Sequence, residues 1–417
     1  MGFIWGAIKI IIVLGTLITI HELGHFLVAK ACNVKVHKFS IGFGKKLFCK
    51  QKGETEYTIR LFPFGGFVQL EGEDERSDDP RAFNNKPIWQ RMLIIVAGAT
   101  VNIVFALAVY CGVCLVDNTY ITTTLVEVAE DTAIYKAGIR AGDTIKAING
   151  KKTVTANHVQ ELITKENPNG MVFLIERDGQ EQEIMANIPM KEIGLLGVVF
   201  DSENNIIKSV EKNSAAEKAK LLPGYKIISI NESENLRIEE YIDIIRDNPN
   251  KEMKFVFEDT EGDVKDYLLT PSSYEIKDFD VEYERKEDAN IFENLYYAID
   301  ETGYYFNANI MAMIQMFTGK MENVQVMGPV GIAQEISSTE KLTNLFLLMS
   351  AISLSLGIFN LLPVPALDGG KFLILLIELI RRKPMKEKTE ITIQLIGFAL
   401  LITVALIVTV GDIIKLF

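Results

Sequence analysis

Four long apolar stretches limit what this chain can fold into. They cover residues 3–29, 92–116, 342–362 and 391–410, and each is about as long as the roughly 20 residues that a helix needs to cross a bilayer. The overall hydrophobic content of 48% agrees with this pattern. We therefore expect a polytopic α-helical membrane protein with four transmembrane helices.

The first apolar stretch ends in a motif made of His21, Glu22 and His25. On a helix, residues four apart share a face, so His21 and His25 can present two imidazoles to one metal ion. Glu22 lies beside them, where it could accept a proton from a water that the metal activates. A chance match in a core helix is the alternative, but two imidazoles and a carboxylate inside a membrane are costly without a function. The stretch has no small-residue cleavage site, so we expect a transmembrane helix rather than a signal peptide.

The charged residues are unevenly distributed. Residues 117–340 carry a net charge of −19, and the remainder of the chain carries +7. The basic surplus follows the first span and precedes the fourth (Lys30, Lys35, Lys38, Lys45, Lys46, Lys50, Lys52; Arg381, Arg382, Lys383, Lys386, Lys388). Short basic loops stay in the cytoplasm, whereas a long acidic domain can be translocated. We therefore expect the loop at residues 30–91 and the loop near residues 381–390 to lie in the cytoplasm, and both ends of the chain to face outside. The basic residues orient the protein in the lipid bilayer, and nothing indicates a nucleic-acid partner.

The region after the first span is predicted to be rich in β-structure. Residues 34–39 and 56–61 alternate between apolar and polar side chains, which is typical of short strands. Residues 62–70 are apolar and contain two glycines, which is unusual for a cytoplasmic loop. A membrane-associated β-hairpin beside the active site would explain them, because non-helical backbone is tolerated at membrane depth when it lines a cavity. A small soluble hairpin is the alternative.

In the second span, Asn102 and the pair Cys111 and Cys114 could each serve either helix packing or chemistry. Gly98 and Asn102 are four apart, which favours close helix packing, although Asn102 could instead act near the metal. Cys111 and Cys114 have redox spacing, but we expect them to be small apolar packing residues.

An internal repeat lies between the second and third spans. Residues 133–149 recur at 215–231, and Asn-Pro-Asn at 167–169 recurs at 248–250. A period of about 80 residues is too long for a solenoid unit, so we expect two extracytoplasmic α+β domains that resemble the PDZ domain. PDZ domains bind an extended peptide by adding it as a strand to a sheet edge. A purely structural spacer is the alternative.

The third span leads into Asp368, whose carboxylate is a candidate third ligand. Two histidines and one carboxylate supply the three protein ligands of a catalytic zinc, and water takes the fourth position. A helix-capping role for Asp368 is the alternative. We expect four transmembrane helices, at residues 1–32 (with the histidine motif), 91–117, 342–380 (with the Asp motif) and 390–415. Between them we expect a β-rich cytoplasmic-side region at 33–90, the two PDZ-like domains at 121–195 and 196–275, and an amphipathic membrane-surface segment at 290–340.

These motifs together resemble the bacterial site-2 protease family, of the regulator-of-sigma-E protease type with tandem PDZ domains. The resemblance rests on the His21–His25 motif, residues 39–44, residues 64–67 and residues 360–369. It implies a zinc-dependent intramembrane endopeptidase that uses Zn²⁺ bound by His21, His25 and Asp368, with Glu22 as catalytic base. It also implies a bacterial inner (plasma) membrane, with the active site near the cytoplasmic side. The implied substrates are single-span membrane proteins, such as membrane-anchored anti-sigma factors, or remnant signal peptides. The residues implied in substrate binding are Phe64, Gly65, Gly66, Phe67, Asn360, Pro363 and Pro365.

Two other classes of function compete with the protease. A membrane-anchored PDZ adaptor without activity would not need His21, Glu22 and His25 intact. A metal transporter would need a polar route across the bilayer, and the second and fourth spans offer few ionisable residues.

Overall fold

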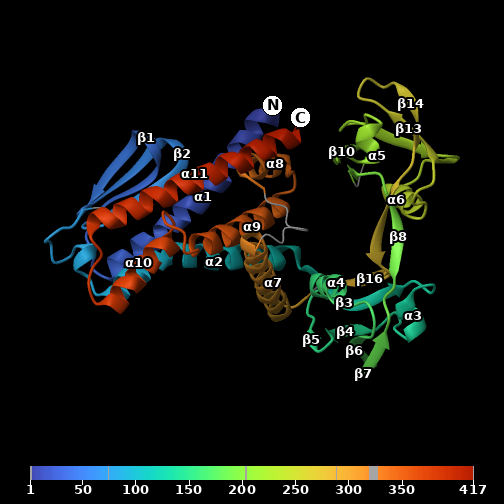
Figure 1. Ribbon diagram of the computed structural model, residues 1–417, viewed down its shortest axis with the longest axis horizontal. Helices are drawn as coiled ribbons and strands as arrows, with labels where there is room; N and C mark the ends of the chain where they lie inside the picture. Colours follow the sequence, from blue (N-terminus) through green and yellow to red (C-terminus); the bar gives the residue numbers. More distant parts are fainter. Residues whose placement is uncertain (1, 74, 202–203, 288, 319–326, 417) are drawn as a thin grey trace. The chain divides into compact units, whose positions relative to one another are not determined.

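The computed structural model describes residues 2–73, 75–201, 204–287, 289–318 and 327–416 (Figure 1). The chain divides into two compact units. One consists of Met1–Tyr120 and Lys286–Phe417, and the other is Ile121–Arg285.

The first unit contains the apolar helices. Among the described residues, four helices have the length and composition to cross a membrane, which confirms the expected number. Continuous runs of Leu, Ile, Val and Ala form them, and Asn118, in the left-handed conformation with φ of 50°, ends the second. These helices are α1 (Gly2–Ala31), α2 (Ile88–Asp117), α9 (Leu342–Asn360) and α11 (Glu387–Leu416).

Helix α2 packs closely between α1 and α9. A Cβ added to Gly24 of α1 would lie 2.5 Å from the carbonyl oxygen of Ala97. A Cβ added to Gly357 of α9 would lie 2.8 Å from the carbonyl oxygen of Ala99. Glycine at these crossings lets the backbones approach, as is common where transmembrane helices associate.

The expected third helix over residues 342–380 is broken in two. Helix α9 ends at Asn360, and a separate helix α10 (Asp368–Arg381) follows a turn that contains Pro363 and Pro365. Proline has no N–H to donate and clashes with the preceding helical turn, so the helix cannot continue through this segment. The break places Asp368 in the first turn of α10.

Strands β1 (Val36–Lys52) and β2 (Thr55–Leu70) pair as an antiparallel hairpin beside α1 (Figure 1), and the hairpin folds back on itself. Residues 38–41 of β1 pair on one side with residues 56–59 of β2 and on the other with residues 66–69, so the expected short strands are segments of two long, bent strands. The turn between the strands therefore lies beside Val36, whose carbonyl oxygen accepts a hydrogen bond of 2.8 Å from Thr55 Oγ1. Gly42 and Gly65 have positive φ values of 83° and 114°. Large apolar side chains are exposed on the hairpin: Phe43, Leu47, Phe48, Ile59, Leu61 and Phe62.

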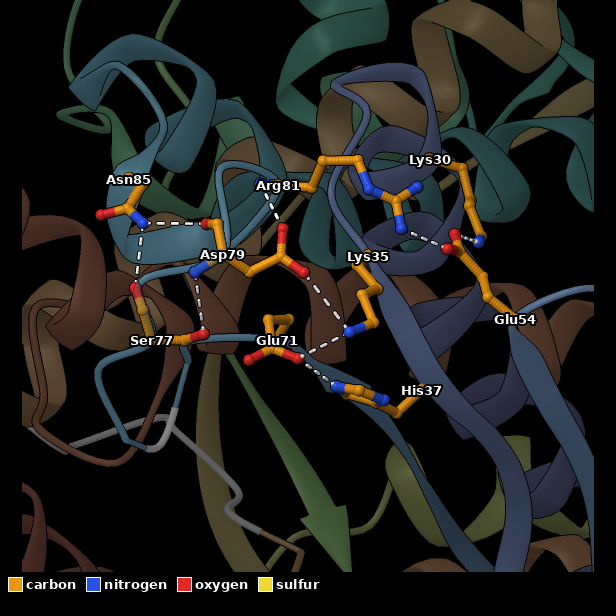
Figure 2. Close-up of polar contacts among 9 residues, drawn as sticks. All are labelled: Lys30, Lys35, His37, Glu54, Glu71, Ser77, Asp79, Arg81 and Asn85. Carbon is orange, nitrogen blue, oxygen red and sulfur yellow. Dashed lines mark hydrogen bonds and ion pairs between the residues drawn. The ribbon is translucent and has the colours of Figure 1, made fainter.

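The polar connection from the hairpin to α2 folds back onto the base of the hairpin (Figure 2). The carboxylate of Glu71 accepts hydrogen bonds from His37 Nε2 at 2.6 Å and from Lys35 Nζ at 3.3 Å. Glu54 accepts from Lys30 Nζ at 2.8 Å and pairs with Arg81. A short 3₁₀ helix, η1 (Phe83–Asn85), then leads into α2.

The sequence repeat in the second unit builds the same order of elements twice, except that the second copy begins with one additional strand. In both copies an asparagine with positive φ (Asn149, 50°; Asn231, 53°) bonds through its side chain to the backbone of a neighbouring strand. The copies have separate hydrophobic cores. The first consists of β3 (Thr119–Val128), α3 (Ala133–Ala137), β4 (Thr144–Ile148), β5 (Lys151–Lys152), α4 (Ala156–Lys165), β6 (Met171–Arg177) and β7 (Gln180–Ala186); the second of β9 (Val198–Phe200), β10 (Ile207–Val210), α5 (Ala215–Lys218), β11 (Lys226–Ile230), β12 (Ser233–Glu234), α6 (Ile238–Arg246), β13 (Met253–Glu258) and β14 (Val264–Leu269).

The boundaries of the two repeats differ from the expected 121–195 and 196–275. Strand β8 (Met190–Leu195) pairs with β15 (Ser272–Lys277), not with the first sheet. Strand β16 (Val281–Glu287) lies beyond residue 275 and joins the first sheet next to β3. The chain therefore leaves the first domain, builds the second and returns, because β3 offers an edge that β16 completes.

Two further helices follow the second unit in the chain. Helix α7 (Ile291–Thr318) and helix α8 (Pro329–Ser338) fall in the expected amphipathic segment 290–340, of which residues 319–326 lie outside the described residues. Lys9 of α1 donates to the carbonyl oxygens of Ser337 and Thr339 at 3.2 and 2.7 Å, so α8 is bound to α1.

Candidate active site

Helices α1 and α10 bring three metal-binding side chains together. His21 and His25 lie on one face of α1, and the carboxylate of Asp368 approaches them from the first turn of α10. Asp368 Oδ2 is 3.1 Å from His21 Nε2 and 3.3 Å from His25 Nε2, and the two Nε2 atoms are 3.1 Å apart. All three side chains are largely shielded from solvent.

This donor set fits zinc. Ligand atoms about 2.0–2.2 Å from a tetrahedral zinc are roughly 3.4 Å from one another, and the three distances here are close to that value. Two imidazole nitrogens and one carboxylate oxygen leave a fourth position for water, as catalytic zinc sites require. Among the described residues, this is the one group of three His, Cys, Asp or Glu side chains close enough to hold an ion.

The backbone of α2 orients the ring of His25. Its Nδ1 lies 2.8 Å from the carbonyl oxygen of Ile94, which can only accept a hydrogen bond. The proton of the neutral ring is therefore on Nδ1, and the Nε2 lone pair faces His21 and Asp368. Such an outer hydrogen bond fixes the tautomer and raises the basicity of a metal-binding imidazole.

Asn102 contacts the ring of His21 in a similar way. The side chain of Asn102 is fully buried, and its Nδ2 lies 3.4 Å from His21 Nδ1, while its Oδ1 has no hydrogen-bond partner among the described residues. If His21 binds metal through Nε2, its Nδ1 carries the proton, so the amide group must turn over to present Oδ1 to the ring, which also gives the buried oxygen a donor. The sequence left open whether Asn102 packs or acts near the metal, and the structure puts it beside His21.

Gly98 leaves space for the two histidine rings. A Cβ at this position would lie 2.4 Å from His25 Nε2 and 2.8 Å from His21 Nε2. Any larger residue would therefore collide with both nitrogen atoms. The sequence indicated Gly98 only as a packing residue, and its contact with the site depends on how α1 and α2 cross.

Glu22 and the hairpin border the same space. A cavity of about 170 Å³ contains the three candidate ligands and Glu22. Gly66 of β2 packs against Glu22, because a Cβ there would lie 3.3 Å from Glu22 Cγ. The lining residues are His21, Glu22, His25, Phe67, Val68, Leu70, Glu73, Phe83, Ile94, Ile95, Asp368 and Lys371.

The residues expected to bind substrate fall in two groups. Phe67 lines the cavity and Gly66 borders Glu22, and Gly65 and Phe64 precede them in β2, although the side chain of Phe64 lies outside the described atoms. Asn360 ends α9, and Pro363 and Pro365 lie in the turn before α10. These three are not among the described residues that line the catalytic cavity.

Two charged lining residues, Glu73 and Lys371, were not anticipated from the sequence. Lys371 of α10 donates to Glu73, which follows the hairpin, at 2.8 Å, and both side chains line the cavity. Lys371 comes three residues after Asp368, so it shares a helical face with the candidate ligand. That spacing was the only available signal, and the position of Glu73 depends on the fold of the polar connection.

A His-Glu-x-x-His helix and an Asp from a second helix, set in a bundle of membrane-spanning helices, define an intramembrane metalloprotease. Comparison with known proteins agrees: the profile of Peptidase family M50 matches residues 9–404. The chain belongs to this family, the site-2 proteases, and it is a zinc-dependent intramembrane metalloprotease.

Curated relatives match over nearly their whole length. The regulator of sigma-E protease RseP of Escherichia coli K12 is 30% identical over 438 residues, covering 96% of this chain and 97% of that protein. The regulator of sigma E protease of Haemophilus influenzae is 29% identical over 447 residues, covering all of both chains. Among solved structures, an HtrA-type protease AlgW with a decapeptide aligns with 25% of this chain at 16% identity and a TM-score of 0.21.

Proposed function

We propose that this protease binds one zinc ion through His21, His25 and Asp368, uses Glu22 as general base, and cleaves a transmembrane segment of a single-span membrane protein. The observation that carries the proposal is the convergence of two imidazoles and one carboxylate, 3.1–3.3 Å apart, in a cavity that also contains Glu22. The names of the relatives support substrates of the anti-sigma-factor kind, and remnant signal peptides have the same single-span form.

In the proposed reaction, the metal would supply polarisation and the side chain of Glu22 would transfer the proton. Zinc, when bound, would polarise the scissile carbonyl group and lower the pKa of water near it. Glu22 would accept the proton of the attacking water and pass it to the leaving amine, which is the exchange a general base makes in peptide hydrolysis.

The substrate must be extended before it is cut, because a helical peptide bond is shielded by its own hydrogen bonds and side chains. We propose that residues 64–67 of β2 bind it as an added strand. Support comes from Phe67 in the cavity wall and from Gly66 against Glu22. The exposed apolar side chains of the hairpin, among them Leu47 and Phe62, suit contact with lipid. Asn360, Pro363 and Pro365 would hold the substrate from the side of the α9–α10 turn.

We further propose that the second unit is a pair of PDZ-like domains on the outer side of a bacterial inner membrane, with the active site toward the cytoplasm. The repeated order of strands and helices supports two related domains. In the second copy Lys220, with φ of 60°, occupies the position of Gly138, with φ of 110°, so both turns keep a left-handed backbone. The pair would act mainly as a size filter that excludes substrates with a large outer domain, and secondarily as a peptide-binding module.

The test of the proposed function is co-expression of Glu22→Gln and wild-type enzyme with candidate single-span proteins. The amide cannot accept a proton from water, so intact substrate should accumulate with Glu22→Gln and a cleaved fragment should appear with wild type. The purified variant should still hold zinc, because the three ligands are unchanged. Cleavage by Glu22→Gln near the wild-type rate would exclude Glu22 as the base.

A further inference from the structure

The fourth span contacts the turn that carries Asp368. Gln394 of α11 accepts, through Oε1, a hydrogen bond of 2.6 Å from the backbone N–H of Ala366. Ala366 lies two residues before Asp368, in the turn between α9 and α10. Because a backbone N–H can only donate, the contact fixes which end of the Gln394 amide faces the turn.

Ala366 has a backbone conformation that needs support. Its φ is 76°, in the left-handed region that residues with a Cβ seldom adopt. Neighbouring backbone groups are bonded within the turn: Val364 N–H to Leu362 O at 2.7 Å, and Leu367 N–H to Val364 O at 3.1 Å. The N–H of Ala366 is satisfied by Gln394 instead, so α11 completes the hydrogen bonding of this turn.

A second contact holds α11 against the same turn. A Cβ added to Gly397 would lie 2.3 Å from the carbonyl oxygen of Pro365, so only glycine allows the helix to approach this closely. Gly397 follows Gln394 by three residues and therefore lies on the same face of α11. The two contacts together bind one face of the fourth span to residues 365 and 366.

Gln394 also faces the space next to the active site. A cavity of about 520 Å³ contains Gln394 and Ala366 in its wall and shares Glu73 and Lys371 with the catalytic cavity. The Nε2 of Gln394 is buried there, with no hydrogen-bond partner among the described residues.

We propose that Gln394 is a positioning residue for Asp368. By holding Ala366 in its left-handed conformation, Gln394 sets where α10 begins, and so keeps the Asp368 carboxylate between the two imidazoles. The inference rests on the proposed assignment of Asp368 as a zinc ligand. It gives α11, which otherwise supplies no candidate ligand, a defined part in the metal site.

The test measures zinc release to a chelator in detergent, without substrate. Gln394→Met keeps the length of the side chain and removes the amide acceptor. It should release zinc about 10-fold faster than wild type, at the lower end of the 10- to 100-fold loss of affinity that follows removal of a group bonded directly to a ligand, because Gln394 acts through the backbone of Ala366. Gln394→Glu keeps an acceptor oxygen and should restore slow release. Ile396→Ala, at a neighbouring side chain that is 65% exposed, is the matched control and should behave as wild type.

A second variant tests the same contact if Gln394→Met fails to fold. Gly397→Ala leaves Gln394 unchanged but forces α11 away from Pro365, and it should also speed zinc release. Wild-type release rates in both Gln394→Met and Gly397→Ala would overturn the inference.

Asp368→Ala separates failure of this inference from failure of the proposed function. If Asp368→Ala releases zinc at the wild-type rate, Asp368 is not a ligand, and both fail. If Asp368→Ala releases zinc quickly but Gln394→Met and Gly397→Ala release it at the wild-type rate, the positioning role of Gln394 is excluded and the assignment of Asp368 as a ligand stands.

Discussion

Oδ2 of Asp368 lies 3.1 Å from Nε2 of His21, although one residue begins a helix near the end of the chain and the other lies in the first membrane span. The contact depends on the break between α9 and α10, which turns the first residue of α10 toward α1.

Asp368→Ala should lower zinc content from about one ion per chain to well below one. Two imidazoles alone leave the site without its third protein ligand. Metal analysis of purified protein in detergent measures the content, with His37→Gln as a control, because His37 belongs to the hairpin base and bonds to Glu71. Full zinc occupancy and activity in Asp368→Ala would remove Asp368 from the ligand set.

Gly98→Ala should abolish both zinc binding and cleavage. The added methyl group would lie 2.4 Å from His25 Nε2 and must displace the ring or the helix. Gly112→Ala is the matched control on the same helix, since no atom lies within 4 Å of its added Cβ. Zinc content and turnover are measured for both variants. Equal behaviour of the two would show that Gly98 does not border the metal.

Gly66→Ala should reduce turnover by roughly 10²-fold or more while leaving zinc in place. The new Cβ would lie 3.3 Å from Glu22 Cγ and 2.9 Å from the carbonyl oxygen of Ser40, so it disturbs the candidate base and the hairpin but not the ligands. Gly53→Asn, in the turn between β1 and β2, is the control, because asparagine tolerates its φ of 62° and no atom lies within 4 Å of an added Cβ. Unchanged kcat in Gly66→Ala would separate the hairpin from catalysis.

Proline substitutions within residues 64–67 test whether this segment binds substrate as a strand. Phe64→Pro and Gly66→Pro each remove a backbone donor and stiffen the strand. Cleavage should fall while folded protein and zinc remain. Normal cleavage by both variants would mean that this segment does not bind substrate as a strand.

Removal of the second unit should let the enzyme cut a substrate that still carries its outer domain, if the unit is a size filter. The cut must follow the structural boundary, Ile121–Arg285, because a deletion that ends at residue 272 would leave β16 without its partner β3. If the unit mainly recruits substrate, the shortened enzyme should leave the untrimmed form intact and cut the trimmed form more slowly. Fragment analysis of both substrate forms decides between the two.

The polar connection should loosen at acid pH. Hydrogen bonds from Ser77 and His37, together with Lys35, lower the pKa of Glu71 from 4.5 to about 2. A lowered folded-state pKa means that the charged carboxylate stabilises the fold above pH 4.5 and that this contribution is lost as pH falls toward 2. The protection factors of the amides in residues 77–85, which are exchange rates corrected for the intrinsic rate at each pH, should therefore fall as the pH drops from 5 toward 2. Glu71→Gln should show low protection across the whole range; a pH response of its protection factors equal to wild type would exclude Glu71 as the cause.

The sequence by itself determined the membrane spans, the candidate ligands and the repeat. Span length follows from bilayer thickness, so four long apolar stretches suffice to predict α1, α2, α9 and α11. The pairing of His21 with His25 follows from the helical repeat alone. The recurrence of residues 133–149 at 215–231 likewise required two similar domains, whatever their arrangement.

Only the tertiary structure decided which other groups surround the site. Asn102, Gly98 and the carbonyl of Ile94 contact the histidines because α2 crosses α1 at Gly24, and no local pattern encodes a crossing point. The return of β16 to β3 and the hydrogen bond from Ala366 to Gln394 are also contacts between distant segments. Local sequence determines backbone periodicity and solvent preference, whereas contacts between distant elements depend on the packing of the whole chain.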